Sequence, residues 1–261
     1  MQSRDSADLD VRIGDGALRL TLTRPERLNA LTGAMVQALC EALEGAVARD
    51  DVRCVVITGS GGSFSAGADV EGPDAHERFD VSALDAANRL VRAITNLDKP
   101  VVAAVNGVAA GVGCSMALAC DLVLATSSAQ FLLAFTRIGL MPDGGSSYTV
   151  AASIGRAKAM RMALLAEPIS GQEAYDAGLV SHLVADDELD ALVDKLVRRL
   201  AGGAPLAFAA TKKAVNAATL PGLHEALERE RVGQTLLLRS EDVAEGMRAF
   251  NEKRRPRFGG R

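Results

Sequence analysis

The sequence predicts an α/β fold in which a sheet-rich core is followed by a helical tail. Continuous apolar runs at residues 54–58 and 101–105 are typical of buried parallel strands. Segments with helical spacing of apolar residues lie between these runs, and this alternation indicates a parallel sheet with right-handed crossovers. Helical patterns dominate after Asp143. We therefore divide the chain into a core, residues 1–200, and a helical C-terminal region, residues 201–261.

The first predicted elements are two strands, at residues 9–13 and 17–22. Apolar residues alternate with polar ones in the first, and a Gly-Asp-Gly turn separates it from the second. Thr32 is the expected N-cap of a helix whose apolar residues recur at helical spacing up to Val47. The apolar run 54–58 then predicts a buried strand that ends at Gly59.

The middle of the chain continues the alternation of strand and helix. Residues 59–72 are rich in Gly and Ser and are expected to form a loop, and the polar segment 71–80 is expected to form a lid. Lys99-Pro100 ends a helix at 81–95 and begins the strand 101–105. Further elements are predicted as a helix at 111–120, a strand at 122–125, and helices at 157–165, 171–177, 189–200, 206–218, 223–238 and 243–251.

Charge and composition exclude several functions. The chain has 29 Lys and Arg against 33 Asp and Glu, and this balance does not suit a protein that binds nucleic acid through phosphate contacts. The four cysteines form no CxxC pair and lie in apolar stretches, so we expect buried thiols of a reducing compartment. With only three scattered histidines, a dedicated metal site is not expected.

The chain is also expected to be cytoplasmic and to bind no membrane. The N-terminal residues are polar and acidic, unlike a signal peptide. The longest apolar run, around residues 100–119, is broken by Asn106 and three glycines and is unlike a membrane helix.

Three glycine-rich segments follow buried strands or begin helices, at 64–69, 107–113 and 141–145. Glycine lets the backbone approach a ligand, and a helix N-terminus presents unpaired N–H groups. Two such groups aimed at one point would form an oxyanion hole. The alternative is that each segment is an ordinary α/β turn. The spacing matches neither a dinucleotide-binding fingerprint nor a Walker motif.

Together the motifs resemble the enoyl-CoA hydratase/isomerase (crotonase) superfamily, most closely its phenylacetyl-CoA-pathway isomerase branch. The similar segments occur in family order over essentially the whole chain. They are LTRPERLNAL at 22–31, VVITGSGGSFSAGADV at 55–70, KPVVAAVNGVAAGVGCSMALACDLVLA at 99–125, FTRIGLMPDGGSS at 135–147 and GMRAFNEKRRPRF at 246–258.

The resemblance implies a crotonase-like spiral of ββα units with a helical C-terminal trimerisation region. It implies an acyl-CoA thioester as substrate, no cofactor beyond the coenzyme A of that substrate, and a homo-oligomer, either a trimer or a dimer of trimers. The thioester oxygen would be held by the backbone N–H groups of Ala68 and Val112. The resemblance also implies substrate-binding residues at Arg27, Leu28, Ser65, Ala66, Asp69, Gly111, Phe135, Phe250 and Lys253.

These residues would contact different parts of the substrate. Arg27 and Leu28 match contacts to the CoA pyrophosphate and adenine, and the segment 65–69 matches the pantetheine and adenine edge. Phe250 and Lys253 match residues that reach the CoA of a neighbouring subunit. For Lys253 the alternative is a solvated basic tail, since basic residues are dense around it.

The chain departs from the family at the general acid/base. Hydratases of the family use two glutamates to activate water, and the matching positions here are Ser115 and Phe135. Neither side chain can serve as a base near neutral pH. Between residues 101 and 170 the carboxylates are Asp121, Asp143 and Glu167. We expect Asp121 to be structural and Glu167 to be solvated in a turn.

Asp143 is the remaining candidate acid/base. Its place before a predicted helix also suits an N-cap aspartate. In several isomerase branches of the family this position carries the single catalytic carboxylate. One carboxylate can take a proton from C2 of a 3-enoyl thioester and return it to C4. Apolar Phe135, Leu132 and Met141 would exclude water and raise its pKa.

The residues leave other functions open. One is hydration, or rearrangement of an aromatic-derived CoA epoxide. Another, of a different class, is a catalytically weak acyl-CoA-binding protein, which the loss of both hydratase glutamates would fit.

Overall fold

The computed structural model describes residues 4–6, 8–72, 76 and 79–261. The lid expected at 71–80 includes residues 73–75 and 77–78, which lie outside the described residues, so the expectation stays a prediction.

The largest sheet of the described chain confirms the predicted strands and adds two at its edges. Its order is β1-β2-β3-β4-β6-β8-β11. The pairs β1–β2 and β2–β3 are antiparallel, and every pair from β3 onward is parallel. The bounds are β1 Arg4–Ser6, β2 Leu9–Gly14, β3 Ala17–Leu22, β4 Cys54–Gly59, β6 Val101–Val105, β8 Leu122–Thr126 and β11 His182–Val184.

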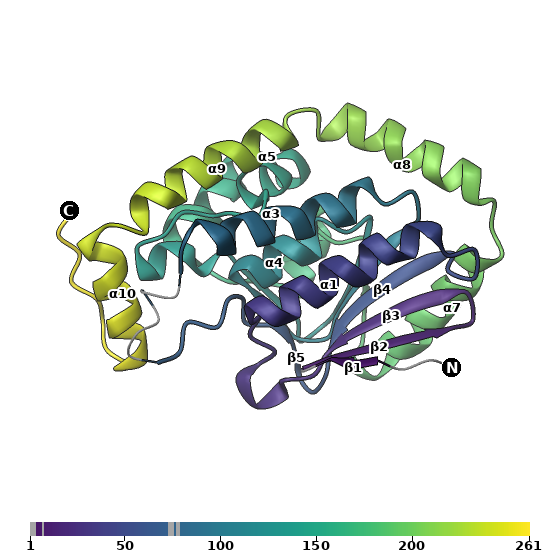
Figure 1. The fold of residues 1–261 in the computed structure, drawn as a ribbon, viewed down its shortest axis with the longest axis horizontal. Helices are drawn as coiled ribbons and strands as arrows, with labels where there is room; N and C mark the ends of the chain where they lie inside the picture. The colour runs from purple at the N-terminus through teal and green to yellow at the C-terminus, as the bar shows by residue number, and fades with distance from the viewer. Residues whose placement is uncertain (1–3, 7, 73–75, 77–78) are drawn as a thin grey trace.

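The apolar runs are continuous because helices cover both faces of this sheet. Val55 and Ile57 of β4 belong to the core under α1 (Gly33–Gly45), α3 (Val81–Asn96) and α4 (Gly111–Leu118). Cys54 and Val56 of the same strand pack toward α7 (Leu189–Ala201) on the opposite face. Figure 1 shows α1, α3 and α4 on one side of the strands and α7 on the other. This is the arrangement expected of a parallel sheet.

A second, smaller sheet corrects the prediction that residues 59–72 form only a loop. Its order is β10-β9-β7-β5, with bounds β5 Ser63–Ser65, β7 Val108–Ala110, β9 Gln130–Leu132 and β10 Ile169–Ser170. Its strands have two or three residues each, too few to show a hydrophobic period. Each of β4, β6 and β8 is followed by a strand of the small sheet and then by a helix. The chain therefore repeats a ββα unit, as the predicted α/β spiral of such units requires.

The later helices agree with the predicted ones except at the start of α5. This helix begins at Ser146 instead of residue 157, and Gly155 interrupts it with a φ of 77°. Its first part is rich in small and hydroxyl residues, which hide the helical pattern. The bounds are α5 Ser146–Leu165, α6 Gly171–Ala177, α8 Pro205–Thr219, α9 Leu223–Leu237 and α10 Glu241–Asn251, with short 3-10 helices η1 Pro25–Arg27, η2 Ala46–Ala48, η3 Ala134–Ile138 and η4 Asp186–Glu188.

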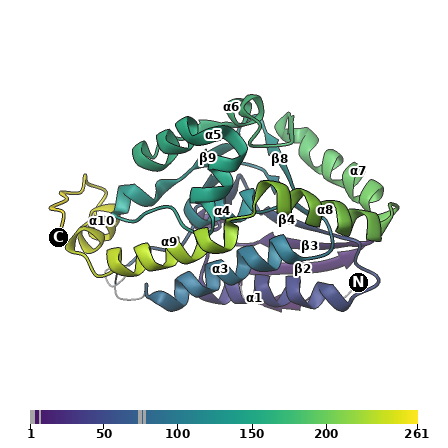
Figure 2. The same ribbon diagram turned by 90° about the horizontal axis from the view of Figure 1, so that it is seen from above.

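The three C-terminal helices differ in how they meet the core. Helix α9 packs against α3 and α5, and Figure 2 shows it alongside α3. Helix α10 packs against η3 at the end of the molecule that carries the C-terminus (Figure 1). Helix α8 has no buried residue, and Leu206 on it is 85% exposed. Helix α9 therefore places its buried residues against the interior elements α3 and α5.

Several smaller predictions can be compared with the structure. All four cysteines are buried free thiols, as predicted. Asp121 has the predicted structural role, because its carboxylate accepts a hydrogen bond from the Val101 N–H and pairs with Lys212 at 2.8 Å. Glu167 is paired with Arg161 at the surface. No helix in the described part of the chain is long and apolar enough to cross a membrane.

The cap of α1 gives a direct test of the fold. The Thr32 hydroxyl accepts a hydrogen bond from the Met35 N–H at 3.2 Å, as the sequence predicted. Replacing Thr32 with Ala should lower the free energy of unfolding by about 1 kcal/mol, because one helix N–H loses its acceptor. Urea denaturation measures this. The control is Thr219→Ala near the exposed end of α8, which should change stability less; equal losses in both variants would contradict the capping role.

Candidate active site

The two amides assigned to the oxyanion hole lie in segments that follow strands of the small sheet. Ala68 forms an isolated parallel bridge with Leu31, in which Leu31 donates to the Gly67 carbonyl at 2.7 Å and Asp69 donates to the Leu31 carbonyl at 3.1 Å. Because successive strand amides point to opposite sides, the Ala68 N–H points away from Leu31. Val112 is the second residue of α4, so its N–H lacks an acceptor within the helix.

A direct backbone contact joins these two segments. Gly67 has a φ of 94°, and a Cβ placed on it would lie 2.8 Å from the Ala110 carbonyl oxygen and 3.4 Å from the Gly111 Cα. Gly111 also has a positive φ, 50°. A side chain at Gly67 would not fit against the Ala110 carbonyl, and the positive φ favours glycine at both positions. The structure therefore brings Ala68 and Val112, each next to one of these glycines, into one region.

The turn that carries Asp143 lies against the start of α4. A Cβ placed on Gly144 would be 3.0 Å from the Ser115 Cβ and 3.8 Å from the Val112 Cγ2. The Ser115 hydroxyl donates to the Asp143 carbonyl at 2.8 Å. The three residues predicted to be catalytic are thus joined by contacts between their immediate neighbours.

The two oxygens of the Asp143 carboxylate differ in their hydrogen bonds. Oδ2 accepts a hydrogen bond from Gln234 Nε2 at 2.8 Å. Oδ1 is buried and has no hydrogen-bond partner among the described residues. Burial raises the pKa of Asp143, the hydrogen bond from Gln234 opposes the rise and the negative charge of Glu230 adds to it, so that the pKa is about 7. A carboxyl group with this pKa can both take and return a proton near neutral pH.

The two positions that replace the hydratase glutamates are fully enclosed. Ser115 is completely buried, and its hydroxyl is used by the Asp143 turn and by the Gly111 carbonyl. Phe135 lies in η3 and packs into the main core. Neither position offers a titratable group to a water molecule.

The sequence analysis did not predict two buried polar residues of this site. Glu230 and Gln234 lie one turn apart on α9 and contact the turn that includes Asp143. They occupy the buried stripe that also contains Leu223 and Leu227. The sequence signal that could have identified them is their position on an otherwise apolar stripe of a helix.

Residues 12–261 match the sequence profile of the family described as Enoyl-CoA hydratase/isomerase. The chain belongs to this family. A solved enoyl-CoA hydratase from Mycobacterium avium subsp. paratuberculosis has a TM-score of 0.92 at 48% identity, covering 98% of this chain and 100% of that one.

Relatives of the chain within the enoyl-CoA hydratase/isomerase family have different names. A 1,2-epoxyphenylacetyl-CoA isomerase of Escherichia coli is 39% identical over 251 residues, 94% of this chain and 96% of that protein. A probable enoyl-CoA hydratase of Rhodobacter capsulatus is 43% identical over 251 residues, 95% and 96% of the two chains. The resemblance inferred from the motifs is confirmed, and the chain is an enzyme of an acyl-CoA family. Because relatives are named as isomerases and as hydratases, the type of reaction must be inferred from the residues present here.

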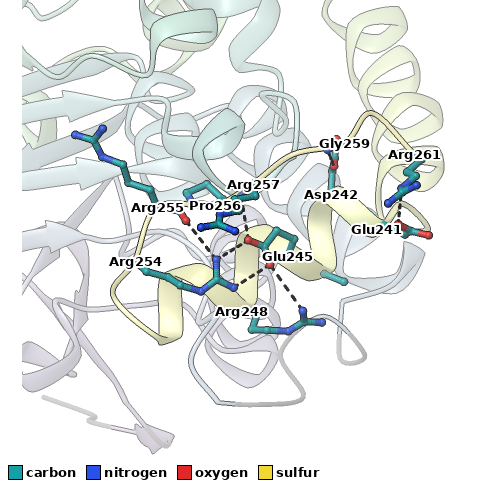
Figure 3. A pocket seen from close by; sticks show the side chains of 11 residues that line it. Glu241, Asp242, Glu245, Arg248, Arg254, Arg255, Pro256, Arg257, Gly259 and Arg261 are labelled. Carbon is teal, nitrogen blue, oxygen red and sulfur yellow. Dashed lines mark hydrogen bonds and ion pairs between the residues drawn. The ribbon is translucent and has the colours of Figure 1, made fainter.

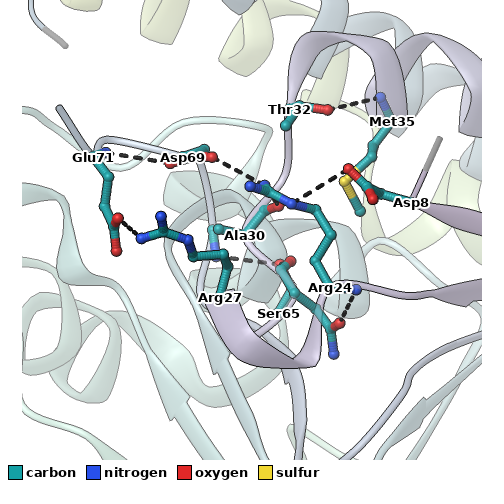
Figure 4. A network of polar contacts seen from close by, with 11 residues as sticks. Asp8, Arg24, Arg27, Ala30, Thr32, Met35, Ser65, Asp69 and Glu71 are labelled. Atoms are coloured by element: carbon teal, nitrogen blue, oxygen red, sulfur yellow. Dashed lines mark hydrogen bonds and ion pairs between the residues drawn. The ribbon is translucent and has the colours of Figure 1, made fainter. Parts of the chain in front are cut away.

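The residues expected to bind CoA surround a polar network that follows β3 (Figure 4). Arg24 is at its centre and pairs with Asp69 at 3.0 Å and with Asp8 at 3.4 Å. Arg27, beside it, pairs with Glu71. Leu28 is 54% exposed and has a φ of 49°.

Ser65 and Ala66 are held by backbone hydrogen bonds in this region. The Ser65 hydroxyl is buried, donates to the Asn29 carbonyl and accepts from the Gly67 N–H. The Ala66 N–H donates to the Leu28 carbonyl at 2.8 Å. The Ser65 side chain therefore supports the loop from within and offers no exposed group to a ligand.

Phe250 lies in the last turn of α10 and Lys253 just beyond the helix. Neither residue lines the surface cavity of about 880 Å³ that Glu245, Arg248 and Arg254 help to form (Figure 3). Phe250 is 54% exposed, and Lys253 is exposed just beyond the helix. Asn251, between them, donates to the Val70 carbonyl at 3.1 Å and so joins α10 to the segment after Ala68. Several nearby arginines are paired, for example Arg254 with Glu245.

The raised pKa of Asp143 predicts how stability depends on pH. The unfolded chain keeps the ordinary pKa of 3.8, whereas the folded value is about 7, so the folded state binds an extra proton between these values. Stability therefore falls as pH rises through this window, by about 2–4 kcal/mol. Asp143→Asn should remove this fall and be more stable than wild type at pH 8. Urea denaturation from pH 4 to pH 8 measures the effect, and an unchanged slope would contradict it.

Glu245 provides a control of opposite sign. Hydrogen bonds, first from Arg254, lower the pKa of Glu245 to about 2. Its contribution to stability is present above the ordinary pKa and is lost as pH falls, so Glu245→Gln should be less stable than wild type at pH 7.

Proposed function

We propose that this enzyme is an enoyl-CoA isomerase that moves a double bond in an acyl-CoA thioester, with Asp143 as the acid/base. The observation that carries the proposal is the buried Oδ1 of Asp143, which has no hydrogen-bond partner among the described residues and belongs to a turn packed against the start of α4. The absence of a carboxylate at positions 115 and 135 supports it.

The proposed reaction needs one base and one oxyanion hole. Oδ1 of Asp143 takes a proton from C2 of a 3-enoyl thioester, and the electron pair of that C–H bond delocalises over the dienolate. The negative thioester oxygen is stabilised by the N–H groups of Ala68 and Val112. The protonated carboxyl then gives its proton to C4, which leaves the double bond between C2 and C3. A pKa of about 7 suits both transfers.

Hydration is less compatible with the same residues. The two-carboxylate route needs a second carboxylate free to activate water. Glu230 is close enough to affect the pKa of Asp143, but both its oxygens accept backbone hydrogen bonds, from Gly145 at 2.6 Å and Ser147 at 3.0 Å. It is therefore not free to bind and activate a water molecule.

A second candidate function is rearrangement of an aromatic-derived CoA epoxide. It is favoured by the similarity to the Escherichia coli 1,2-epoxyphenylacetyl-CoA isomerase at 39% identity. A single carboxylate beside an oxyanion hole could also serve that reaction.

The same proposal assigns the substrate contacts and the assembly. Arg27 and Leu28 would meet the CoA pyrophosphate and adenine, and the segment from Ser65 to Asp69 its pantetheine edge. A homo-oligomer, a trimer or a dimer of trimers, would cover exposed apolar residues of α8 such as Leu206. In it, Phe250 and Lys253 would reach the CoA bound to a neighbour.

Replacing Asp143 with Asn tests the acid/base role. Turnover of trans-3-hexenoyl-CoA, followed as formation of the conjugated 2-enoyl product, should fall about 10²–10⁴-fold, because the amide cannot take the proton. The control is Glu167→Gln, which removes an exposed carboxylate paired with Arg161 and should leave turnover unchanged. Wild-type turnover in Asp143→Asn would overturn the proposal.

Proton exchange in D2O separates the alternatives within the same experiment. Deuterium incorporation at C2 and C4 is expected from the wild-type enzyme. Tight binding of the ester without exchange at either carbon would instead identify a catalytically weak binder, and a 3-hydroxyacyl product would identify a hydratase.

The backbone contact at Gly67 tests the oxyanion hole. In Gly67→Ala the new methyl group would meet the Ala110 carbonyl at 2.8 Å on a backbone with a φ of 94°. Displacement of the Ala68 amide should lower kcat about 10²–10³-fold, the cost of one oxyanion donor. Gly62→Ala is the matched control, because a Cβ there has no neighbour within 4 Å. The idea fails if both variants turn over like wild type.

A further inference from the structure

We propose that Gln234 and Glu230 of α9 are positioning residues for Asp143, which together orient its carboxylate so that Oδ1 alone exchanges protons with the substrate. The proposal rests on the proposed function, since it assigns how the acid/base of that reaction is held. The two residues come from a helix about 90 positions beyond Asp143 in the chain.

Gln234 uses both ends of its amide on the segment that carries Asp143. Its Oε1 accepts a hydrogen bond from the Met141 N–H at 3.0 Å, and its Nε2 donates to Asp143 Oδ2 at 2.8 Å. The side chain is completely buried. An amide has both an acceptor and a donor, which this bridge requires. The bridge fixes the Asp143 side chain relative to its own backbone and occupies Oδ2.

Glu230 holds the other side of the same turn. Its Oε2 accepts from the Gly145 N–H at 2.6 Å and its Oε1 from the Ser147 N–H at 3.0 Å. These are N–H groups at the start of α5, where a negative charge is favoured. The Glu230 side chain is buried. Burial raises the pKa of Glu230, and the hydrogen bonds from Ser147 and Gly145 oppose this rise and so favour a charged carboxylate close to Asp143.

Close packing of α9 makes this arrangement rigid. A Cβ on Gly233 would lie 2.5 Å from the Met141 Sδ, so the helix lies directly against the segment before Asp143. Ser115 holds the Asp143 carbonyl from the opposite side. With Oδ2 bonded and the turn held on both flanks, Oδ1 has no hydrogen-bond partner in the described part of the chain.

The two residues act on the proton of Asp143 in opposite directions. The negative charge of Glu230 raises the pKa of Asp143, whereas the hydrogen bond from Gln234 lowers it. Ser115 of α4 and Phe135 of η3 carry no charge.

The charged side chains of the neighbouring elements have other partners or act elsewhere. On η3, Arg137 donates to the Ala166 carbonyl. On α9, Arg231 pairs with Asp85. Burial raises the pKa of Glu230, and the charge of Arg229 is the weakest of the groups that oppose this rise.

The test is the pH dependence of kcat/KM for trans-3-hexenoyl-CoA in two variants. In the wild-type enzyme the rate rises with pH as Asp143 loses its proton. Glu230→Gln removes the nearby charge and should move this rise to lower pH, by about half a unit to one unit. Gln234→Met keeps the approximate shape of the side chain but removes the donor, so the rise should move to higher pH by a similar amount. The Gln234 variant should also lose rate at its pH plateau, because the carboxylate is no longer oriented.

Glu228→Gln is the matched control, because it removes one negative charge from an exposed position of the same helix. Its pH profile should match that of the wild type. If Glu230→Gln does not fold, as judged by circular dichroism, Glu230→Asp replaces it. That variant keeps the charge but withdraws it by one methylene, and a smaller shift to lower pH is expected.

The positioning role is wrong if kcat/KM of the variants at 230 and 234 rises at the same pH as in the wild type and only the rate is reduced. That result would show a purely structural role. That failure is distinct from failure of the proposed function. An inactive Asp143→Asn together with unshifted profiles rejects only the positioning role, whereas an active Asp143→Asn rejects the acid/base assignment itself.

Discussion

The site depends on the backbone contact between Gly67 and the residues Ala110 and Gly111. Strands β5 and β7 pair in the small sheet, and the chain leaves both at the same end. A Cβ on Gly67 would lie 2.8 Å from the Ala110 carbonyl oxygen, and a Cβ on Gly113 would lie 2.7 Å from the Ser65 side chain. Both distances are too short for a side chain. Two segments distant in sequence are therefore fixed by direct backbone packing. In the proposed oxyanion hole, amides held in this way would not need to reorganise when charge develops on a bound oxygen.

The ββα repeat explains why a third segment arrives at the same place. Strand β9 pairs with β7 in the small sheet, and the chain continues from it through η3 to the Asp143 turn. The loops after three successive units thus converge, as is common for the carboxyl ends of parallel strands. The contact of Gly144 with Ser115 then joins the third segment to α4. Ser115, where hydratases of the family have a glutamate, here contributes a hydrogen bond to the fold of the turn.

The sequence predicted the elements with long or strongly periodic patterns. Helices cover both faces of the strands around Val55 and Val102, and such strands need continuous apolar runs. These runs made the two strands predictable from the sequence. The small sheet was missed because strands such as Ser63–Ser65 are short and rich in small residues. Ala68, Val112 and Asp143 were assigned from the family resemblance, but their proximity follows from the pairing of strands that the sequence did not predict.

Glu230 and Gln234 were missed for a different reason. Their contacts join residues more than 80 positions apart, and nothing in the local pattern of a helix says which turn its buried polar residues will meet. A polar residue on a buried stripe predicts only that a partner exists, because an unpartnered buried polar group is costly.

Two carboxylates buried near each other can have different functions because their hydrogen bonds differ. Glu230 has a donor on each oxygen, both at the N-terminus of a helix, so its negative charge is compensated where it lies. Asp143 has one donor and one bare oxygen, so burial acts on it with less compensation and its pKa rises to about 7. The bare oxygen lowers the stability of the folded chain above neutral pH. It also leaves an oxygen with no bond to break before it accepts a proton, and this asymmetry supports the proposal that Asp143 is the acid/base.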